Sequence, residues 1–317
     1  MALACACSGG GGIPTAPESL RPETIGDPAL AHIKALVALG PRPAGSPALR
    51  KASEYLVEEL KKAKVAAEVD TWSDHGLDYR NVVARIQPAD GAKDAPLVLL
   101  GTHYDTKNFA GHPDPANNFR FVGANDGGSG TGVLLALAGR IKDLPGRKAE
   151  VWLLFFDGEE SQHPTDWQTG HPLAGSTRVV QRLNSDWSEA RKRLKAMVLL
   201  DMIGARDLTI DCEQNSTPGL RALLREEATR LGHAGVLARE EDGHPVEDDH
   251  MPFIKTGIPA LDLIDFKKRQ PEFGKSGDAT RWWHTGFDDL PILSTRSLQI
   301  VGELVLALIP RLERFGG

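Results

Sequence analysis

Hydrophobic and polar residues alternate along this chain with two different periods, and each period predicts its own type of element. Apolar residues spaced three and four apart predict helices, whereas a period of two or a short apolar run predicts a strand. The predicted helices are residues 29–39, 46–64, 129–141, 173–183, 218–231 and 294–312. The predicted strands are residues 65–72, 79–86, 96–101, 151–156, 197–203 and 259–264.

The order of these elements predicts the fold class. From residue 96 onward strands alternate with helices, which is typical of a mostly parallel sheet covered by helices on both faces. We therefore expect an α/β protein built as a three-layer αβα sandwich. Four long polar loops separate the elements, at residues 108–121, 161–172, 240–252 and 266–282. Loops of this length in a compact domain are usually functional.

Composition and charge exclude several classes of protein. The chain has 317 residues, of which 41% are hydrophobic and 25% charged, an ordinary globular composition. Its formal net charge is −6 and no basic stripe is present, which argues against nucleic acid or an anionic membrane as a partner. No run of 18 apolar residues occurs, so we expect no transmembrane segment.

The first 25 residues differ from the rest of the chain. They are rich in Gly, Ala and Pro, and Cys5 and Cys7 precede a run from Gly9 to Gly12. This resembles the mature start of a bacterial lipoprotein, although the basic and apolar parts of a signal peptide are missing. Two accounts stay open. In one, translation starts upstream, so that Cys5 or Cys7 carries a lipid anchor and the protein is exported to the periplasm or cell envelope of a bacterium. In the other, residues 1–25 are a flexible tail without function.

Acidic and imidazole side chains gather where the predicted strands end. His103 follows the strand at 96–101, and Asp201 ends the apolar run Val198-Leu199-Leu200. Because ligands bind at the carboxyl edge of open α/β sheets, we expect these side chains to meet there. The full set is His103, Asp105, Asp126, Glu159, Glu160, Asp201, Asp248, Asp249, His250 and His284.

So many carboxylates at close range require a cation, because otherwise they raise one another's pKa. Imidazole together with carboxylate oxygen suits zinc. We expect Asp126, Glu160 and His284 to be zinc ligands, with His103 and Asp201 completing a second metal position if one is filled. Taken singly, each residue has an ordinary explanation, such as a helix cap for Asp126. The conjunction of several such residues at successive strand ends favours the metal site.

Six short motifs occur in an order found in a known group of enzymes. They are Gly101-Thr-His-Tyr-Asp105, Gly123-Ala-Asn-Asp126, Phe155-Phe-Asp-Gly-Glu-Glu160, Leu199-Leu-Asp-Met-Ile-Gly204, Asp248-Asp-His-Met-Pro-Phe253 and Trp283-His-Thr285. From about residue 30 to residue 312 the chain resembles the zinc-dependent exopeptidases and their relatives, the animal-type glutaminyl cyclases (glutaminyl-peptide cyclotransferases). The resemblance implies that residues 26–317 form one zinc-dependent catalytic domain with a mixed, mostly parallel central sheet.

Within this clan the resemblance leaves two activities to separate. Aminopeptidases use two zinc ions, and the residues that match their ligands are His103, Asp126, Glu160, Asp201 and His284. Cyclases bind one zinc ion at Asp126, Glu160 and His284, while the residues matching Asp201 and Asp248 form a hydrogen-bonded carboxylate pair. Asp248 stands where peptidases more often have Ser. Asp262, where animal cyclases carry His, is instead more typical of a peptidase.

The resemblance favours the cyclase and implies a role for each site residue. Such an enzyme converts the N-terminal glutamine of peptides and proteins to pyroglutamate and releases ammonia. Glu159 would carry the proton, Asp201 and Asp248 would hold the leaving amide, and Trp283 and Trp167 would wall the substrate pocket. Two alternatives stay open. The first is a di-zinc aminopeptidase with Glu159 as general base, and the second is a non-catalytic binding scaffold, which predicts the loss of ligands.

Overall fold

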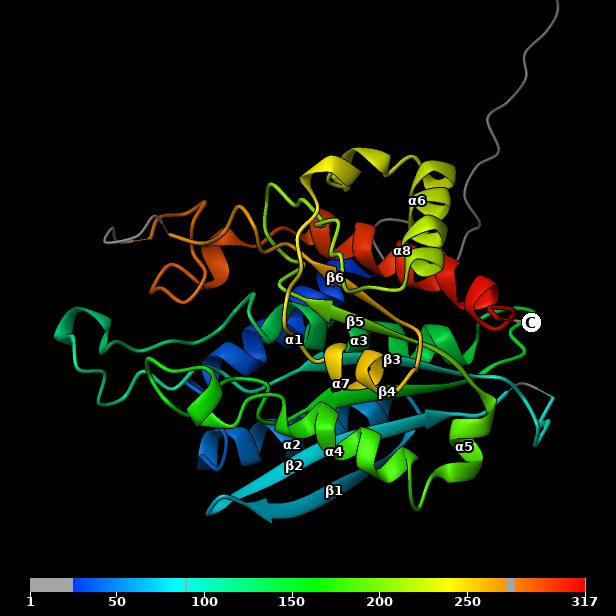
Figure 1. Cartoon of the computed structure of the whole chain (residues 1–317), viewed down its shortest axis with the longest axis horizontal. Helices are drawn as coiled ribbons and strands as arrows, with labels where there is room; N and C mark the ends of the chain where they lie inside the picture. Colours follow the sequence, from blue (N-terminus) through cyan, green and yellow to red (C-terminus); the bar gives the residue numbers. More distant parts are fainter. Residues whose placement is uncertain (1–24, 89, 272–276, 317) are drawn as a thin grey trace, which may run out of the picture.

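A single mixed sheet organises the computed structural model, which describes residues 25–88, 90–271 and 277–316 (Figure 1). Within these ranges six strands pair in the order β1-β2-β4-β3-β5-β6. The strands are β1 (Ala66–Asp74), β2 (Leu77–Ile86), β3 (Leu97–His103), β4 (Glu150–Phe156), β5 (Leu194–Asp201) and β6 (Ala260–Ile264). Residues 1–24, and with them Cys5 and Cys7, lie outside the described residues.

Strand direction divides the sheet into two parts. β1 and β2 form an antiparallel hairpin that turns at His75 and Gly76, and β2 also runs antiparallel to β4. By contrast, β3 is parallel to β4 and β5, and β5 is parallel to β6. Parallel neighbours need long crossover connections, which helices supply here. The α/β fold with a mixed, mostly parallel sheet is therefore confirmed.

Helices cover both faces of the sheet (Figure 1). Successive strand residues point to opposite faces, so Val151, Leu153 and Phe155 of β4 join one core cluster, whereas Trp152, Leu154 and Phe156 join the other. The first cluster contains residues of α1 (Gly26–Ala38), α2 (Pro47–Lys62), α3 (Gly128–Lys142), α6 (Pro218–Leu231) and α8 (Thr295–Leu312). The second contains residues of α4 (Ala174–Leu183), α5 (Ser188–Arg193) and α7 (Met251–Lys255). This arrangement is the predicted three-layer sandwich.

The structure corrects the predicted elements at three places. Helices α5 and α7 were not predicted, because five or six residues are too few to show an apolar period and such helices depend on tertiary packing. The strand predicted at 197–203 instead ends at Asp201. Met202 has a φ of +53°, a left-handed conformation that an extended strand cannot continue. Across the described residues, no helix combines the length and apolar character needed to span a membrane.

Candidate active site

The carboxyl edge of the sheet brings the predicted ligands together from separate elements. His103 is the last residue of β3 and Asp201 the last residue of β5. Glu160 follows β4, and Asp126 lies just before α3. His284 reaches the same place from the segment before α8, although it is more than 120 residues away from Glu160 in the chain. The expectation that strand ends converge is therefore met by the geometry.

Asp126, Glu160 and His284 form one of three groups among the described residues that could hold a metal ion, and we call it group 1. Their ligand atoms lie within 4.8 Å of one another. The Nε2 atom of His284 is 3.0 Å from Oε1 of Glu160 and 3.4 Å from Oδ2 of Asp126. Oδ2 of Asp126 and Oε2 of Glu160 are buried and make no hydrogen bond within the described residues. Because buried carboxylate oxygens normally have partners, a cation fits this group, and its imidazole and carboxylates suit zinc.

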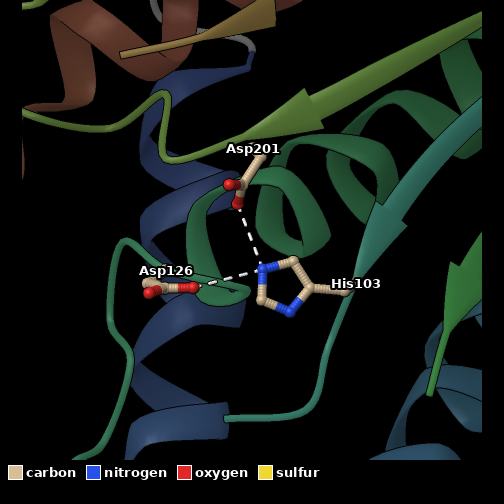
Figure 2. Close-up of side chains that lie close together, drawn as sticks. All are labelled: His103, Asp126 and Asp201. Atoms are coloured by element: carbon tan, nitrogen blue, oxygen red, sulfur yellow. Dashed lines mark hydrogen bonds and ion pairs between the residues drawn. The ribbon is translucent and has the colours of Figure 1, made fainter. Parts of the chain in front are cut away.

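His103, Asp126 and Asp201 form the second group, group 2 (Figure 2). The Nε2 atom of His103 is 3.1 Å from Oδ1 of Asp201 and 3.2 Å from Oδ1 of Asp126. Asp126 therefore belongs to both groups, with one carboxylate oxygen facing each. On the far side of the ring, Nδ1 of His103 lies 3.3 Å from Asp105, a contact that fixes the orientation of the imidazole.

Two buried carboxylates that were given no role from the sequence hold these segments in place. Asp105 accepts hydrogen bonds from the backbone N–H groups of Glu159 and Glu160, both at 3.2 Å. Asp288 accepts from the backbone N–H groups of Asn125 and Asp126, at 2.7 and 3.0 Å. Asp105 stands in the first motif, which was a usable signal. Asp288 had no such signal in the sequence, because its partners are more than 160 residues away.

Gly127, next to Asp126, shows how closely the segments pack. Its φ is +75°, and an added Cβ would lie 2.6 Å from the carbonyl oxygen of Asp105 and 2.9 Å from the ring of His103. Only glycine fits a position that combines a left-handed backbone with so close an approach. The glycine therefore allows Asp126 to come within reach of His103.

A cavity of about 280 Å³ opens onto both groups. Its polar floor contains Asp126, Glu159, Glu160, Asp201, Asp248 and His284. Its apolar walls are Trp167, Met202, Val246, Ile264, Phe266 and Trp283. The two tryptophans were predicted as pocket residues, and Val246 and Phe266 lie in two of the long loops that were predicted to be functional. Met202 and Ile264 were not predicted as pocket residues. The Trp283 ring stacks on His284 at 4.0 Å between centroids, so one wall of the cavity continues into group 1.

The carboxyl groups on the cavity floor have shifted pKa values in the metal-free protein. Burial raises the pKa of Asp248 to about 7, and the charge of Asp201 adds to the rise. Burial likewise raises the pKa of Glu159 well above its ordinary value, and Glu160 and Asp248 act in the same direction. For Glu160 burial is outweighed by the positive charges of His284 and Lys107, so its pKa lies below the ordinary value. Neighbouring carboxyl groups with different proton affinities are characteristic of acid–base sites.

Behind Asp248 lies a further buried group. His250 is fully buried, with Nε2 3.2 Å from Glu213 and Nδ1 3.6 Å from Asp262. One carboxylate oxygen of Asp248, one of Asp262 and one ring nitrogen of His250 lie within 4.8 Å of one another. The Oδ2 atom of Asp248 makes no hydrogen bond within the described part of the chain. The hydrogen-bonded pair of Asp201 and Asp248 therefore stays a prediction.

Comparisons with known proteins agree with this geometry. The sequence profile of peptidase family M28 matches residues 81–309. A glutaminyl-peptide cyclotransferase of Drosophila melanogaster is 28% identical over 240 residues, which cover 67% of this chain and 63% of that protein. The crystal structure of an Acidobacteriales bacterium glutaminyl cyclase is 32% identical, with a TM-score of 0.76 over 92% of this chain and 95% of that one. A Zn-dependent exopeptidase from Parabacteroides distasonis is 27% identical, with a TM-score of 0.76 over 90% and 98%.

The curated relatives and the solved structures differ in how much of their own length aligns with this chain. The first three curated relatives are covered over 62–63% of their length, so the chain spans less than two thirds of them. The family profile, in contrast, includes every residue of groups 1 and 2. Together with the shared fold, this confirms the resemblance seen in the six motifs. The chain belongs to peptidase family M28.

Proposed function

We propose that this protein is a zinc-dependent glutaminyl-peptide cyclotransferase that acts on the N-terminal glutamine of peptides and proteins. The observation that carries the proposal is that the residues of group 1 and Asp248 line the same cavity. Asp248 is buried beside Asp201, where a second acidic side chain would hold a leaving amide. Relatives of this chain named glutaminyl cyclase, with the same fold over more than 90% of its length, support the same activity.

Zinc bound by Asp126, Glu160 and His284 would supply the Lewis acidity that polarises the γ-carbonyl of the glutamine side chain. Cyclisation then forms a bond between the α-nitrogen and the carbonyl carbon (Cδ) of the side-chain amide and breaks the bond from that carbon to the amide nitrogen. The α-amine must lose one proton, and the departing nitrogen must gain one to leave as ammonia. A single group that takes the first proton and returns it balances the reaction.

We assign this role to Glu159. It lines the cavity beside group 1, and in the metal-free protein burial raises its pKa well above the ordinary value, which favours a role in proton transfer. Asp201 and Asp248 line the same floor and would accept hydrogen bonds from the leaving amide. Trp167, Phe266 and Trp283 would exclude water from the site. This exclusion matters because water competes with the α-amine for the carbonyl carbon of the side-chain amide.

Removing and restoring zinc tests the proposal. Protein stripped of metal with a chelator should not convert a glutaminyl peptide to its pyroglutamyl form, and adding zinc back should restore the conversion. Equal conversion by the stripped and the zinc-loaded protein would overturn the proposed role of zinc. A glutaminyl peptide incubated without protein measures the spontaneous reaction.

Group 2 favours a second candidate, a di-zinc aminopeptidase. All five residues that match the ligands of such enzymes are present, and Asp126 faces both groups. With ions in both groups, Glu159 would serve as the general base for peptide hydrolysis instead of carrying a proton to ammonia. The likeness to the Parabacteroides distasonis Zn-dependent exopeptidase supports this candidate. Metal content separates the two, because the cyclase needs one ion per chain and the aminopeptidase two.

A further inference from the structure

Arg42 is a buried cation in the short segment between α1 and α2. Its side chain is fully buried, and the segment Gly40-Pro41-Arg42-Pro43 holds it between two prolines, which restrict the backbone. Every nitrogen of the guanidinium donates to a backbone carbonyl. The acceptors are Tyr104 at 3.1 Å, Val122 at 2.9 Å, Gly123 at 3.2 Å, and Leu36 and Gly40 at 3.3 Å each.

Three of these carbonyls belong to the two segments that carry the predicted ligands. Tyr104 directly follows His103, while Val122 and Gly123 come just before Asn125 and Asp126. The side chain of Arg42 therefore joins the end of β3 to the loop that leads into α3. The backbone of Arg42 adds to this link, since its N–H donates to Oγ1 of Thr106 at 2.8 Å and its carbonyl accepts from the Thr106 N–H at 3.1 Å.

The positive charge of Arg42 lies near negatively charged residues of the site. Burial lowers its pKa to about 10, while Asp105, Asp288 and Asp126 oppose the decrease, so the guanidinium stays positive at neutral pH. Buried charges are tolerated where hydrogen bonds and opposite charges nearby compensate them, and Arg42 has both, with a carbonyl acceptor for each nitrogen and the three carboxylates of the site. A lysine at the same position would keep the charge but could not reproduce the planar set of donors.

We infer that Arg42 is a positioning residue for the metal site, which sets the spacing between His103 and Asp126 by tying their two segments together. The inference rests on the proposed zinc site but not on the reaction that takes place there. It predicts that the geometry of the bound metal, and not only the stability of the fold, depends on the guanidinium.

Arg147 offers a matched control elsewhere in the chain. It is also buried, and it donates to the carbonyls of Ile141, Ala149 and Gln87. It lies between the end of α3 and the start of β4, at the sheet edge opposite the site. Arg42→Lys and Arg147→Lys therefore remove the same kind of hydrogen-bonding from a buried arginine, once beside the metal groups and once far from them.

The test compares the full chain with R42K and R147K in two measurements. Zinc affinity is measured by competition with a chromogenic chelator, and ligand geometry is read from the absorption spectrum of the cobalt(II)-substituted protein. We expect R42K to bind zinc about 10- to 100-fold more weakly, as for other partners that orient ligands, and to alter the cobalt spectrum. R147K should lower the melting temperature but leave both readouts at the wild-type values.

Wild-type affinity and spectrum in R42K would overturn the inference, as would an equal loss of affinity in R147K. If R42K does not fold, Thr106→Val provides the second test, because it removes only the hydrogen bond that Oγ1 accepts from Arg42. It should weaken zinc binding in the same direction, and unchanged binding would contradict the inference. A wild-type protein that bound no zinc would instead overturn the proposed function, and this inference with it.

Discussion

The Oδ2 atom of Asp126 lies 3.4 Å from Nε2 of His284, while the other oxygen of the same carboxylate faces group 2. One side chain therefore belongs to two groups of potential metal ligands, the arrangement that a two-metal centre would need. What separates the two candidate activities is whether group 2 holds a metal or only protons. The first predictions below address this difference.

Asn substitutions at the two aspartates should have different effects on zinc binding. Asp126→Asn removes a charged ligand from group 1, so we expect zinc affinity to fall at least about 100-fold, more than the loss of an orienting partner costs. Asp201→Asn should leave the group 1 ion in place with unchanged stoichiometry. Zinc content by atomic emission and affinity by chelator competition check both results. A decrease from two ions to one in Asp201→Asn would support the aminopeptidase.

Glu159→Gln should separate catalysis from metal binding. The amide cannot carry the proton from the α-amine to the leaving nitrogen, so we expect kcat to fall about 10²- to 10⁴-fold. Zinc content should stay at the wild-type value, because Glu159 does not belong to group 1. Glu160→Gln is the matched variant, and it should lose zinc as well as activity. Substantial turnover by Glu159→Gln would exclude the role that we assign to this residue.

The two tryptophans in the cavity wall should respond differently to truncation. Trp167 lines the cavity without stacking on His284, so Trp167→Ala should raise KM about 10-fold, the effect of losing about 1.4 kcal/mol of substrate contact, and leave zinc affinity unchanged. Trp283 stacks on His284, so Trp283→Ala should raise KM and also weaken zinc binding. Steady-state kinetics and chelator competition on both variants test this difference. Identical effects on zinc binding would show that the stacking does not orient His284.

Glu213 should make the stability of the metal-free protein depend on pH. Burial opposes its ionisation, but His250 and the backbone N–H groups of Asn215 and Val246 outweigh this effect and lower the pKa of Glu213 from 4.5 to about 2. A pKa lowered by folding stabilises the protein above the unfolded value, and this contribution is lost as the pH falls toward 2. The whole shift corresponds to about 3 kcal/mol, of which about 2 kcal/mol is lost between about pH 6 and pH 3.

Urea unfolding of the wild type and Glu213→Gln at these two pH values, with chelator present, measures the effect. The variant cannot titrate at this position, so its free energy of unfolding should decrease by about 2 kcal/mol less than that of the wild type. Carboxyl groups far from Glu213 titrate equally in both proteins and cancel in the difference. Parallel decreases in the two proteins would contradict the assigned pKa.

The sequence was sufficient to predict the location of residues that follow or end a strand. His103, Glu160 and Asp201 follow or end buried apolar runs, and the rule that such ends meet at one edge placed them correctly. Arg42 and Asp288 could not be found in this way. Their partners in the site segments lie 62 to 163 residues away, and no local pattern encodes such contacts. Helices α5 and α7 were missed because packing, and not periodicity, stabilises them.

Product identity tests the central claim most directly. The zinc-loaded protein is incubated with a peptide that begins with glutamine and, separately, with a leucyl-anilide, and the Glu159→Gln variant serves as the control. The account predicts pyroglutamyl peptide and ammonia in equal amounts from the first substrate and no anilide cleavage from the second. Release of leucine from the anilide without formation of pyroglutamate would contradict the account and identify a peptidase.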